Sequence, residues 1–244
     1  VNTILPAYSN QLVGYWRLNG DYLDSSGNGN HGTPVGSPEF QEGFNLGQQH
    51  VQLATITNYI DIGNDPSLLR GTGDLSLSLW FKVTAPHPVA SSHKVFTIGD
   101  DNVGGKRIQV TVSDSDGSVK LYLDDNVTKF TATTTQSYID NSWHHLVGVR
   151  DTSANELRLY LDGDEIPAGP TDITTLGSID SDSGYGGLIG VSRLASDGSI
   201  TTAAVFSVDE IAYWSRALSD SEAKQLYREQ AEFHASDTQL SSSW

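Results

Sequence analysis

Two acidic loops carry the side chains best suited to hold a hard cation or a polyhydroxylated ligand. Residues 100–105 place two carboxylates and an amide beside two glycines, and adjacent carboxylates repel each other unless a cation or ligand hydroxyls lie between them. Residues 180–187 combine acidic side chains with a tyrosine, and carboxylates that accept hydroxyl protons beside an aromatic ring suit a sugar. A Ser/Gly/Asp loop without any ligand is the alternative. The predicted ligand-binding residues are Asp100, Asp101, Asn102, Asp182, Tyr185 and Arg193, and Asp100 and Asp101 are also predicted calcium ligands.

A third polar loop, residues 20–32, is punctuated by glycines that let the backbone turn tightly. Side-chain and carbonyl oxygens on such a loop can converge on one Ca²⁺. The alternative is a network of Asx turns that satisfies itself without metal. The predicted calcium ligands in this loop are Asp21, Asp24, Asn28 and Asn30.

These loops need a rigid framework, and residues 143–166 give the strongest signal for one. Apolar residues alternate along 143–149 and again along 157–161, which is typical of β-strands. The intervening residues 151–155 have the composition of a hairpin loop, and Asp162-Gly163-Asp164 predicts a tight turn. We therefore expect a β-hairpin in the middle of a sheet.

Most of the remaining chain also predicts strands. Leu75, Leu77, Leu79, Phe81 and Val83 alternate with polar residues and are expected in the core, whereas Trp80 shares the opposite face with serines and is expected to lie under a loop. Ser219 opens a capping box that predicts a short helix to about Arg228. Further strands are predicted at 12–18, 50–53, 59–62, 107–112, 119–123, 124–135, 188–193 and 205–215.

Four stretches resemble one family in the expected order. They are Leu18-Asn19-Gly20-Asp21 with Asp24 to Gly32, Leu75 to Phe81, the hairpin WHHLVGVRD with LRLYLDG, and Val208-Asp209-Glu210-Ile211 with Arg216-Ala217-Leu218-Ser219. This pattern resembles the laminin-G-like and pentraxin-like branch of the concanavalin A-like lectin superfamily. The resemblance implies an all-β jelly-roll sandwich of two antiparallel sheets with one short C-terminal helix, over residues 12–232 between linkers 1–11 and 233–244. It also implies that the 20–32 loop approaches Asp209, which joins the predicted calcium ligands, and that a ligand binds at a rim of loops.

Composition limits the function further. The net charge of −16 argues against nucleic-acid binding, because phosphate contacts need basic patches. Only eight of the 30 acidic residues are Glu, and the excess of Asp suits a protein that meets Ca²⁺; an acidic surface that serves solubility is the alternative. There is no Cys, and no apolar run long enough for membrane insertion. This composition, with a start that lacks Met, resembles modules excised from secreted bacterial repeats-in-toxin adhesins, so we expect a monomeric module of a longer extracellular or cell-surface protein.

Signals for catalysis are weak. No Glu-x-Asp-x-x-Glu strand of the jelly-roll glucanases is present, and His144 and His145 are expected to point to opposite faces of one strand. We therefore predict a non-catalytic, calcium-assisted lectin module that mediates adhesion to fucose-, galactose- or mannose-type glycans on host or neighbouring cells. The alternative is an accessory carbohydrate-binding module of a polysaccharide-degrading enzyme, and a polysaccharide lyase is a weaker third. A rival binding surface is a polar groove on the sheet formed by Gln109, Tyr122, Arg158 and Tyr160.

Overall fold

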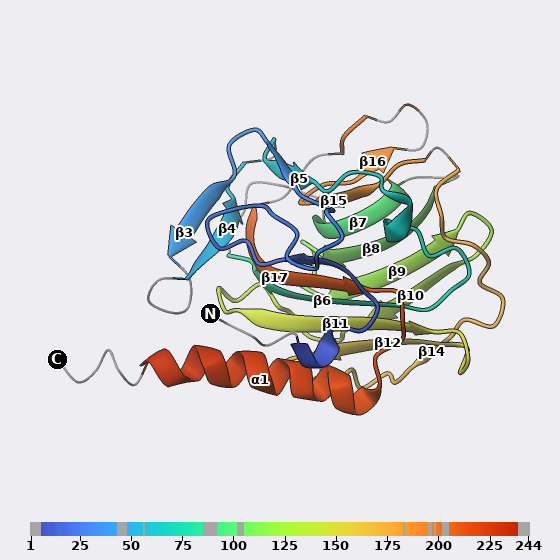
Figure 1. Ribbon diagram of the computed structural model, residues 1–244. Helices are drawn as coiled ribbons and strands as arrows, with labels where there is room; N and C mark the ends of the chain where they lie inside the picture. Colours follow the sequence, from blue (N-terminus) through green and yellow to red (C-terminus); the bar gives the residue numbers. More distant parts are fainter. Residues whose placement is uncertain are drawn as a thin grey trace.

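Two antiparallel β-sheets pack face to face in the computed structural model, and a long C-terminal helix covers the outer face of one of them (Figure 1). The structure describes residues 6–42, 48–55, 57–84, 92–101, 105–182, 184–194, 197, 199–201 and 205–238. The predicted all-β jelly-roll sandwich with one C-terminal helix is confirmed.

The first sheet follows the strand order β13-β12-β11-β6-β17-β4-β3, with β1 added on β17 and β14 on β12. Its strands are β1 (Leu12–Trp16), β3 (Glu39–Glu42), β4 (Gln49–Leu53), β6 (Leu75–Lys82), β11 (His144–Asp151), β12 (Glu156–Leu161), β13 (Asp164–Glu165), β14 (Thr171–Asp172) and β17 (Phe206–Trp214).

The second sheet follows the order β10-β9-β8-β7-β15-β5-β2, and the short β16 pairs with β7 in parallel. Its strands are β2 (Thr33–Val35), β5 (Tyr59–Asp61), β7 (His93–Asp101), β8 (Lys106–Val112), β9 (Val119–Asp125), β10 (Lys129–Thr133), β15 (Gly187–Ile189) and β16 (Arg193–Leu194). Two 3₁₀ turns, η1 (Pro6–Tyr8) and η2 (Pro66–Leu68), complete the fold together with α1 (Asp220–Thr238).

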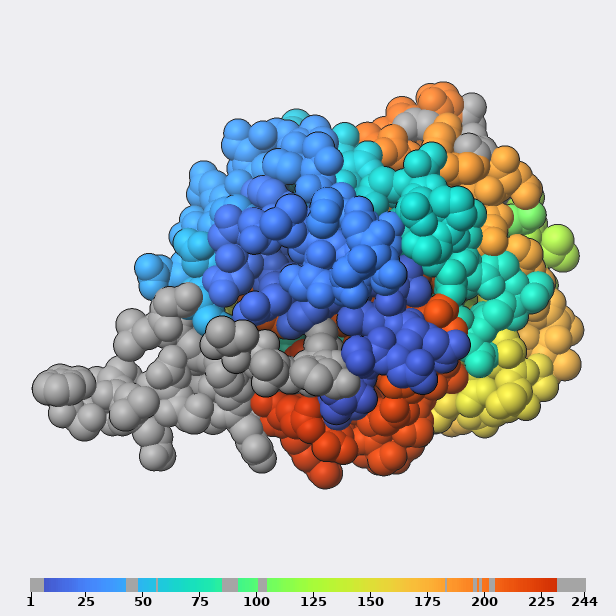
Figure 2. Space-filling view, viewed as in Figure 1, coloured from blue at the N-terminus to red at the C-terminus, as the bar shows by residue number. Residues whose placement is uncertain are grey.

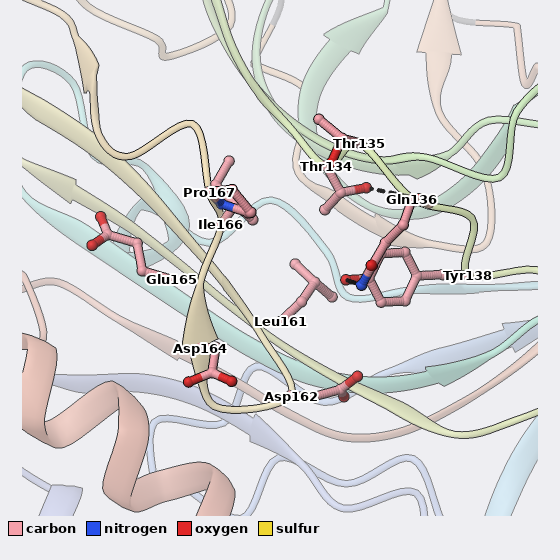
Figure 3. A pocket seen from close by; sticks show the side chains of 10 residues that line it. All are labelled: Thr134, Thr135, Gln136, Tyr138, Leu161, Asp162, Asp164, Glu165, Ile166 and Pro167. Carbon is pink, nitrogen blue, oxygen red and sulfur yellow. Dashed lines mark hydrogen bonds between the residues drawn. The ribbon is translucent and has the colours of Figure 1, made fainter.

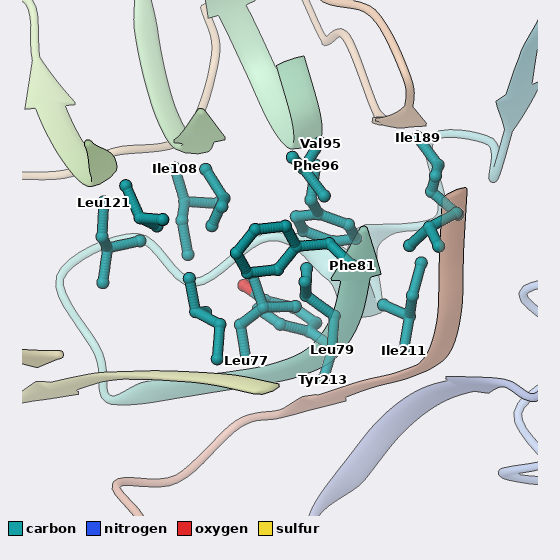
Figure 4. Packing of buried hydrophobic residues seen from close by; sticks show 14 of the residues in the cluster. Leu77, Leu79, Phe81, Val95, Phe96, Ile108, Leu121, Ile189, Ile211 and Tyr213 are labelled. Carbon is teal, nitrogen blue, oxygen red and sulfur yellow. The ribbon is translucent and has the colours of Figure 1, made fainter. Parts of the chain in front are cut away.

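The core lies between the sheets and is made by the inward-facing side chains, which alternate with outward-facing ones along each strand (Figure 4). Leu77, Leu79 and Phe81 of β6 meet Phe96 of β7 and Leu121 of β9 there, and all five side chains are fully buried. The set of core residues predicted on 75–83 is confirmed. The predicted hairpin is also present as β11–β12, but it lies to one side of the sheet, because β6 and β17 occupy the middle.

Helix α1 begins at the predicted capping box. Glu222 N donates to Ser219 Oγ at 3.3 Å, and Ser219 N donates to Glu222 Oε2 at 2.8 Å. The helix then runs to Thr238, beyond the predicted end at Arg228 and into the segment 233–244 that the sequence assigned to a linker. No Gly or Pro interrupts 229–238, so nothing in the chain forces an earlier end.

The helix, not a loop, covers Trp80. Its indole Nε1 donates to Gln230 Oε1 at 2.5 Å, and its ring stacks on Tyr227 with centroids 5.9 Å apart. Residues 6–11 also pack on this side of the sheet: Tyr8 is buried, and its carbonyl accepts from Trp214 Nε1 at 2.7 Å. This segment therefore belongs to the packed domain and is not a free linker. The middle strands of the first sheet are therefore buried on both faces, which directs the search for a site to the loops and the second sheet.

Candidate functional site

The structure brings four of the predicted ligand-binding residues to one rim of the second sheet. β16 runs parallel to the end of β7, so that Arg193 lies opposite Asp100 and Leu194 opposite Asp101. The 180–187 loop crosses the same place, where Ser181 Oγ donates to Asp100 Oδ2 at 2.6 Å and Asp182 Oδ1 pairs with Lys106 Nζ at 2.7 Å. Asn102 lies outside the described residues, and of Asp101 only the backbone position is described.

A shallow hollow of about 260 Å³ opens at this rim. The Arg193 guanidinium lies over the Tyr185 ring at 5.8 Å, and its Nη2 pairs with Asp61 Oδ2 at 2.6 Å. Asn64 Nδ2 reaches the Gly184 carbonyl at 3.5 Å. The lining residues are Asp61, Gly63, Asn64, Gly184, Tyr185, Gly186 and Arg193.

Two glycines allow the loops to approach closely enough to form this hollow. A Cβ on Gly186 would lie 1.7 Å from the Gly63 carbonyl oxygen, so only glycine fits there. Gly63 itself has φ +76°, and its N–H donates to Asp61 Oδ1 at 2.9 Å. In the space-filling view, the surface near residue 60 adjoins the surface of residues 180–194 at the top of the molecule (Figure 2).

Sequence reasoning missed Asp61 and Asn64. The alternation of apolar residues predicts a strand at 59–62 but does not by itself assign its polar position to a site. The signal was available in the alternation, because Ile60 and Ile62 point into the core and Asp61 must therefore face outward. β5 pairs with β15, and this pairing sets Asp61 opposite Leu188 and close to the 180–187 loop.

The Asp100 carboxyl group is buried at the base of the rim, with 2% of the residue exposed. Burial raises its pKa most, the charge of Asp182 raises it further, and the hydrogen bond from Ser181 opposes both. Among the described residues no hydrogen-bond donor reaches Asp100 Oδ1. An acidic oxygen left without a donor fits a bound cation, so Asp100 is the described residue here that could hold Ca²⁺.

The 20–32 loop is arranged differently, because hydrogen bonds within the chain hold the side chains of its predicted calcium ligands in place. Asp24 accepts from the backbone N–H groups of Tyr15, Ser26 and Asn30 at 2.8–2.9 Å. The side-chain amides of Asn28 and Asn30 donate to backbone carbonyls of β1, and Asp21 accepts from Leu23 N at 3.0 Å. These contacts form a network of Asx turns, and calcium binding by this loop stays a prediction.

Asp209 lies on β17 opposite Trp80. Among the described residues, no hydrogen bond or ion pair joins it to Asp21, Asp24, Asn28 or Asn30. A bulge with Glu210 at φ +49° places the two carboxyl groups side by side in the interior, where Tyr15 donates its hydroxyl hydrogen bond to Glu210. Burial raises the pKa of Asp209 well above its usual range, and the Glu210 charge adds to this shift. Within the described part of the chain, no three His, Cys, Asp or Glu side chains form a group that could hold a metal ion.

The rival groove does not exist as one surface. Gln109 and Tyr122 are cross-strand partners on the second sheet, whereas Arg158 and Tyr160 belong to the first. Tyr160 is 1% exposed and packs in the cluster beneath α1, and Gln109 is 2% exposed. His144 and His145 point to opposite faces, as predicted: His145 Nε2 contacts Ser78 Oγ under the helix, and His144 contacts Asp162 and Asp140.

Solved structures with the same architecture include sugar-associated and toxin-derived domains. The chain superposes on the binding domain of Paraclostridial Mosquitocidal Protein 1 with a TM-score of 0.72 and 18% identity, over 91% of this chain and 53% of that one. Domain 4 of AbnA, a GH43 extracellular arabinanase from Geobacillus stearothermophilus solved with arabinotriose, gives a TM-score of 0.68 and 18% identity, over 89% of this chain and 98% of that one. The botulinum neurotoxin serotype D ligand-binding domain, in complex with N-acetylneuraminic acid, gives 0.66 and 14%, over 93% and 53%.

At these identities the similarities establish the fold, and the chain spans about half the length of the toxin domains. No curated protein sequence matches the chain. No helix within the described ranges is both long and apolar enough to span a bilayer. The laminin-G family model described as "Concanavalin A-like lectin/glucanases superfamily" matches residues 54–224, which include the strands of the rim and the β11–β12 hairpin. The chain therefore belongs to the concanavalin A-like lectin/glucanases superfamily.

Proposed function

We propose that this chain is a non-catalytic, carbohydrate-binding module and that the hollow at Asp61, Asn64, Tyr185 and Arg193 is its sugar site. The observation that carries the proposal is the convergence, on one hollow, of an aromatic ring, a guanidinium, a carboxylate and an amide from two distant segments. Sugar recognition needs this combination, because an aromatic face covers C–H groups while polar groups bind hydroxyls.

The polar groups divide the work by their hydrogen-bonding chemistry. Arg193 can only donate, Asp61 can only accept, and Asn64 can do both. Because Asp61 holds the guanidinium at 2.6 Å, the donor fork is fixed before a ligand arrives. A pair of neighbouring sugar hydroxyls then accepts from Arg193 and donates to Asp61, and the Tyr185 ring packs against the sugar.

Calcium belongs to this proposal at Asp100 and Asp101. The buried Asp100 oxygen without a donor and the Asp-rich composition support it. A cation there would offset the repulsion between Asp100 and Asp182 and so stiffen the rim beside the hollow. The role of the 20–32 loop and Asp209 as a second calcium site stays a prediction.

In its biological setting, the module would mediate adhesion to fucose-, galactose- or mannose-type glycans on host or neighbouring cells, as part of a secreted repeats-in-toxin adhesin. The acidic, Cys-free composition supports this setting. The alternative is an accessory module of a polysaccharide-degrading enzyme. The similarity to arabinanase domain 4 favours the alternative, because this chain matches nearly the whole of that domain.

A glycan array probed with and without a calcium chelator tests the proposal. Binding confined to short cell-surface glycans supports adhesion, whereas a preference for repeating plant or algal polymers supports the accessory module. Tyr185→Ala should abolish array binding. Tyr122→Ala, which removes a partly exposed tyrosine on the outer face of the second sheet, is the matched control and should not. Binding that survives Tyr185→Ala and is lost in Tyr122→Ala would place the site on the sheet face and overturn the assignment to the rim.

A further inference from the structure

A second pocket, of about 250 Å³, lies where the edges of the two sheets face each other (Figure 3). One wall is the 134–138 segment that follows β10, and the other is the β12–β13 turn and the residues after it. In Figure 3, Leu161 lies at the centre, with Gln136 and Tyr138 on one side and Ile166 and Pro167 on the other. The residues that line this pocket are all different from those that line the hollow at the rim.

The pocket has an apolar floor and a buried hydroxyl with an unused proton. Leu161 and Ile166 are about 95% buried and belong to the main core, so the floor is rigid. Tyr138 is 5% exposed, and its hydroxyl oxygen accepts from Gln136 Nε2 at 2.7 Å. Among the described residues no acceptor takes the Tyr138 hydroxyl proton, and the second N–H of the Gln136 amide has no partner either. Both donors are therefore available to a ligand.

The acceptors come from the β12–β13 turn. Asp162 has φ +52°, and its carboxylate is fixed on two sides: Oδ1 accepts from His145 N at 2.9 Å, and Oδ2 contacts His144 Nδ1 at 2.8 Å. His144 also contacts Asp140 Oδ1 at 3.1 Å, and the two carboxylates raise the histidine pKa against the effect of its burial. The Asp162 carboxylate thus keeps one orientation at the mouth of the pocket, with lone pairs left for a hydroxyl group.

From this arrangement we infer that the pocket at Gln136, Tyr138 and Asp162 is a second carbohydrate site, specific for an uncharged sugar unit. Its size suits one ring, its aliphatic floor suits the C–H face, and its fixed donors and acceptors suit hydroxyls. The lining includes the carboxylates of Asp162, Asp164 and Glu165 and no Lys or Arg, so a sugar bearing a carboxylate is repelled.

The two sites cannot share one sugar ring. In the second sheet β10 is an edge strand, and four strands separate it from β5. Strands in a sheet lie about 4.8 Å apart, which puts the two sites roughly 20–25 Å from each other across the sheet. They also lie at opposite ends of the strands, because the 134–138 segment follows Thr133, which pairs with Lys120, while the rim lies beside Lys106. The module would therefore bind two separate sugar units, either from two glycans or from distant parts of one polymer.

Amide-resolved NMR titration of the full chain tests this inference. The probes are the methyl glycosides of galactose, mannose and fucose, with N-acetylneuraminic acid as the charged comparison. At least one neutral glycoside should shift the amide signals of 135–138 and 161–166. Tyr138→Phe, which removes only the hydroxyl, and Gln136→Ala should each weaken that binding about fivefold to tenfold. Gln225→Ala, at an exposed glutamine on α1, is the matched control and should leave it unchanged.

The signals of Gly63 and Tyr185 report the rim separately, so either site can fail without the other. Absence of any shift around 135–138 with all three neutral glycosides would overturn the second site and leave the rim proposal standing. Equal binding of N-acetylneuraminic acid would overturn its specificity for uncharged sugars. Unchanged affinity in both Tyr138→Phe and Gln136→Ala would show that the donors do not bind the sugar.

Discussion

The rim proposal makes its sharpest prediction at Arg193, because the side chain should matter far more for binding than for folding. Its ion pair with Asp61 joins two side chains that are 24% and 32% exposed. Pairs with this exposure contribute about 0–1 kcal/mol, and the stacking on Tyr185 adds about 0.5–1 kcal/mol. Arg193→Ala should therefore lower the free energy of unfolding by less than about 2 kcal/mol, and the protein should remain folded.

Sugar binding should respond much more strongly. Losing a charged hydrogen-bond donor to the ligand costs about 1.5–3 kcal/mol, which is roughly a 10- to 150-fold loss of affinity. Arg193→Lys keeps the charge but loses the planar fork and most of the stacking, so it should recover little of that loss. Asp61→Asn should weaken binding as well, because the carboxylate both accepts from the sugar and orients Arg193.

Titration calorimetry with the best glycan from the array measures the affinities, and urea unfolding measures the stabilities. The double variant with Asp61→Asn should lose less affinity than the two single losses combined, because both residues act as one unit. An affinity within twofold of the wild type in Arg193→Ala would refute the assignment. So would a loss of affinity that simply follows the loss of stability.

Three further predictions concern the framework. Burial and, secondarily, the Lys82 charge lower the pKa of His50 to about 4. The free energy of unfolding should therefore fall by up to about 3 kcal/mol as the pH drops from about 6.5 towards 4. Urea unfolding of His50→Leu should show less of this acid dependence. Leu226→Ala, at a fully buried position on the sheet-facing side of α1, should cost about 2–5 kcal/mol in the same assay, against less than about 0.5 kcal/mol for the exposed Gln225→Ala on the same helix. The raised pKa of Asp209 means that its contribution to stability is present below the usual carboxyl range and is lost as pH rises. Asp209→Asn should therefore raise the melting temperature at pH 8 in the presence of a chelator. If the variant instead lowers the melting temperature, and does so only with Ca²⁺, the result would support a calcium site there.

Much of the framework could be predicted because its signals are local. A period of two on residues 75–83 identifies the core face of β6 without knowledge of any partner strand. The Ser219–Glu222 capping box likewise lies within one turn of chain. The predicted end of α1, at Arg228, was wrong because Tyr227 and Gln230 contact Trp80 of a distant strand. This tertiary contact stabilises a part of the helix whose sequence is too polar to predict burial.

The site was only partly predictable because it depends on strand order. Asp100, Asp182, Tyr185 and Arg193 stand out as acidic, aromatic and basic residues on glycine-rich loops, and those patterns are visible in the sequence. That Asp61 completes the hollow follows from the order β7-β15-β5, in which strands separated by more than 30 residues become neighbours. The 20–32 loop shows the converse limit, since its composition fits calcium and self-contained Asx turns equally. The structure shows the Asx hydrogen bonds of Asp24, and calcium binding there stays a prediction.

The distribution of charge at the rim leads to a last prediction, about salt. Although the chain carries a net charge of −16, the basic groups of the rim are each matched by a carboxylate: Arg193 by Asp61, Lys106 by Asp182 and Arg107 by Asp124. A site built from such pairs offers fixed donors and acceptors with no excess positive charge, and it therefore favours hydroxyl-rich, uncharged sugars. Raising the salt concentration from about 0.1 M to about 1 M shortens the Debye length from roughly 10 Å to 3 Å, which screens attraction to a charged ligand and hardly affects hydrogen bonds to a neutral one. Titrations of the bound glycan across this range should give affinities within about twofold of each other. A tenfold or larger fall would mean that the rim binds an anionic sugar through Arg193, with Asp61 displaced from the pair.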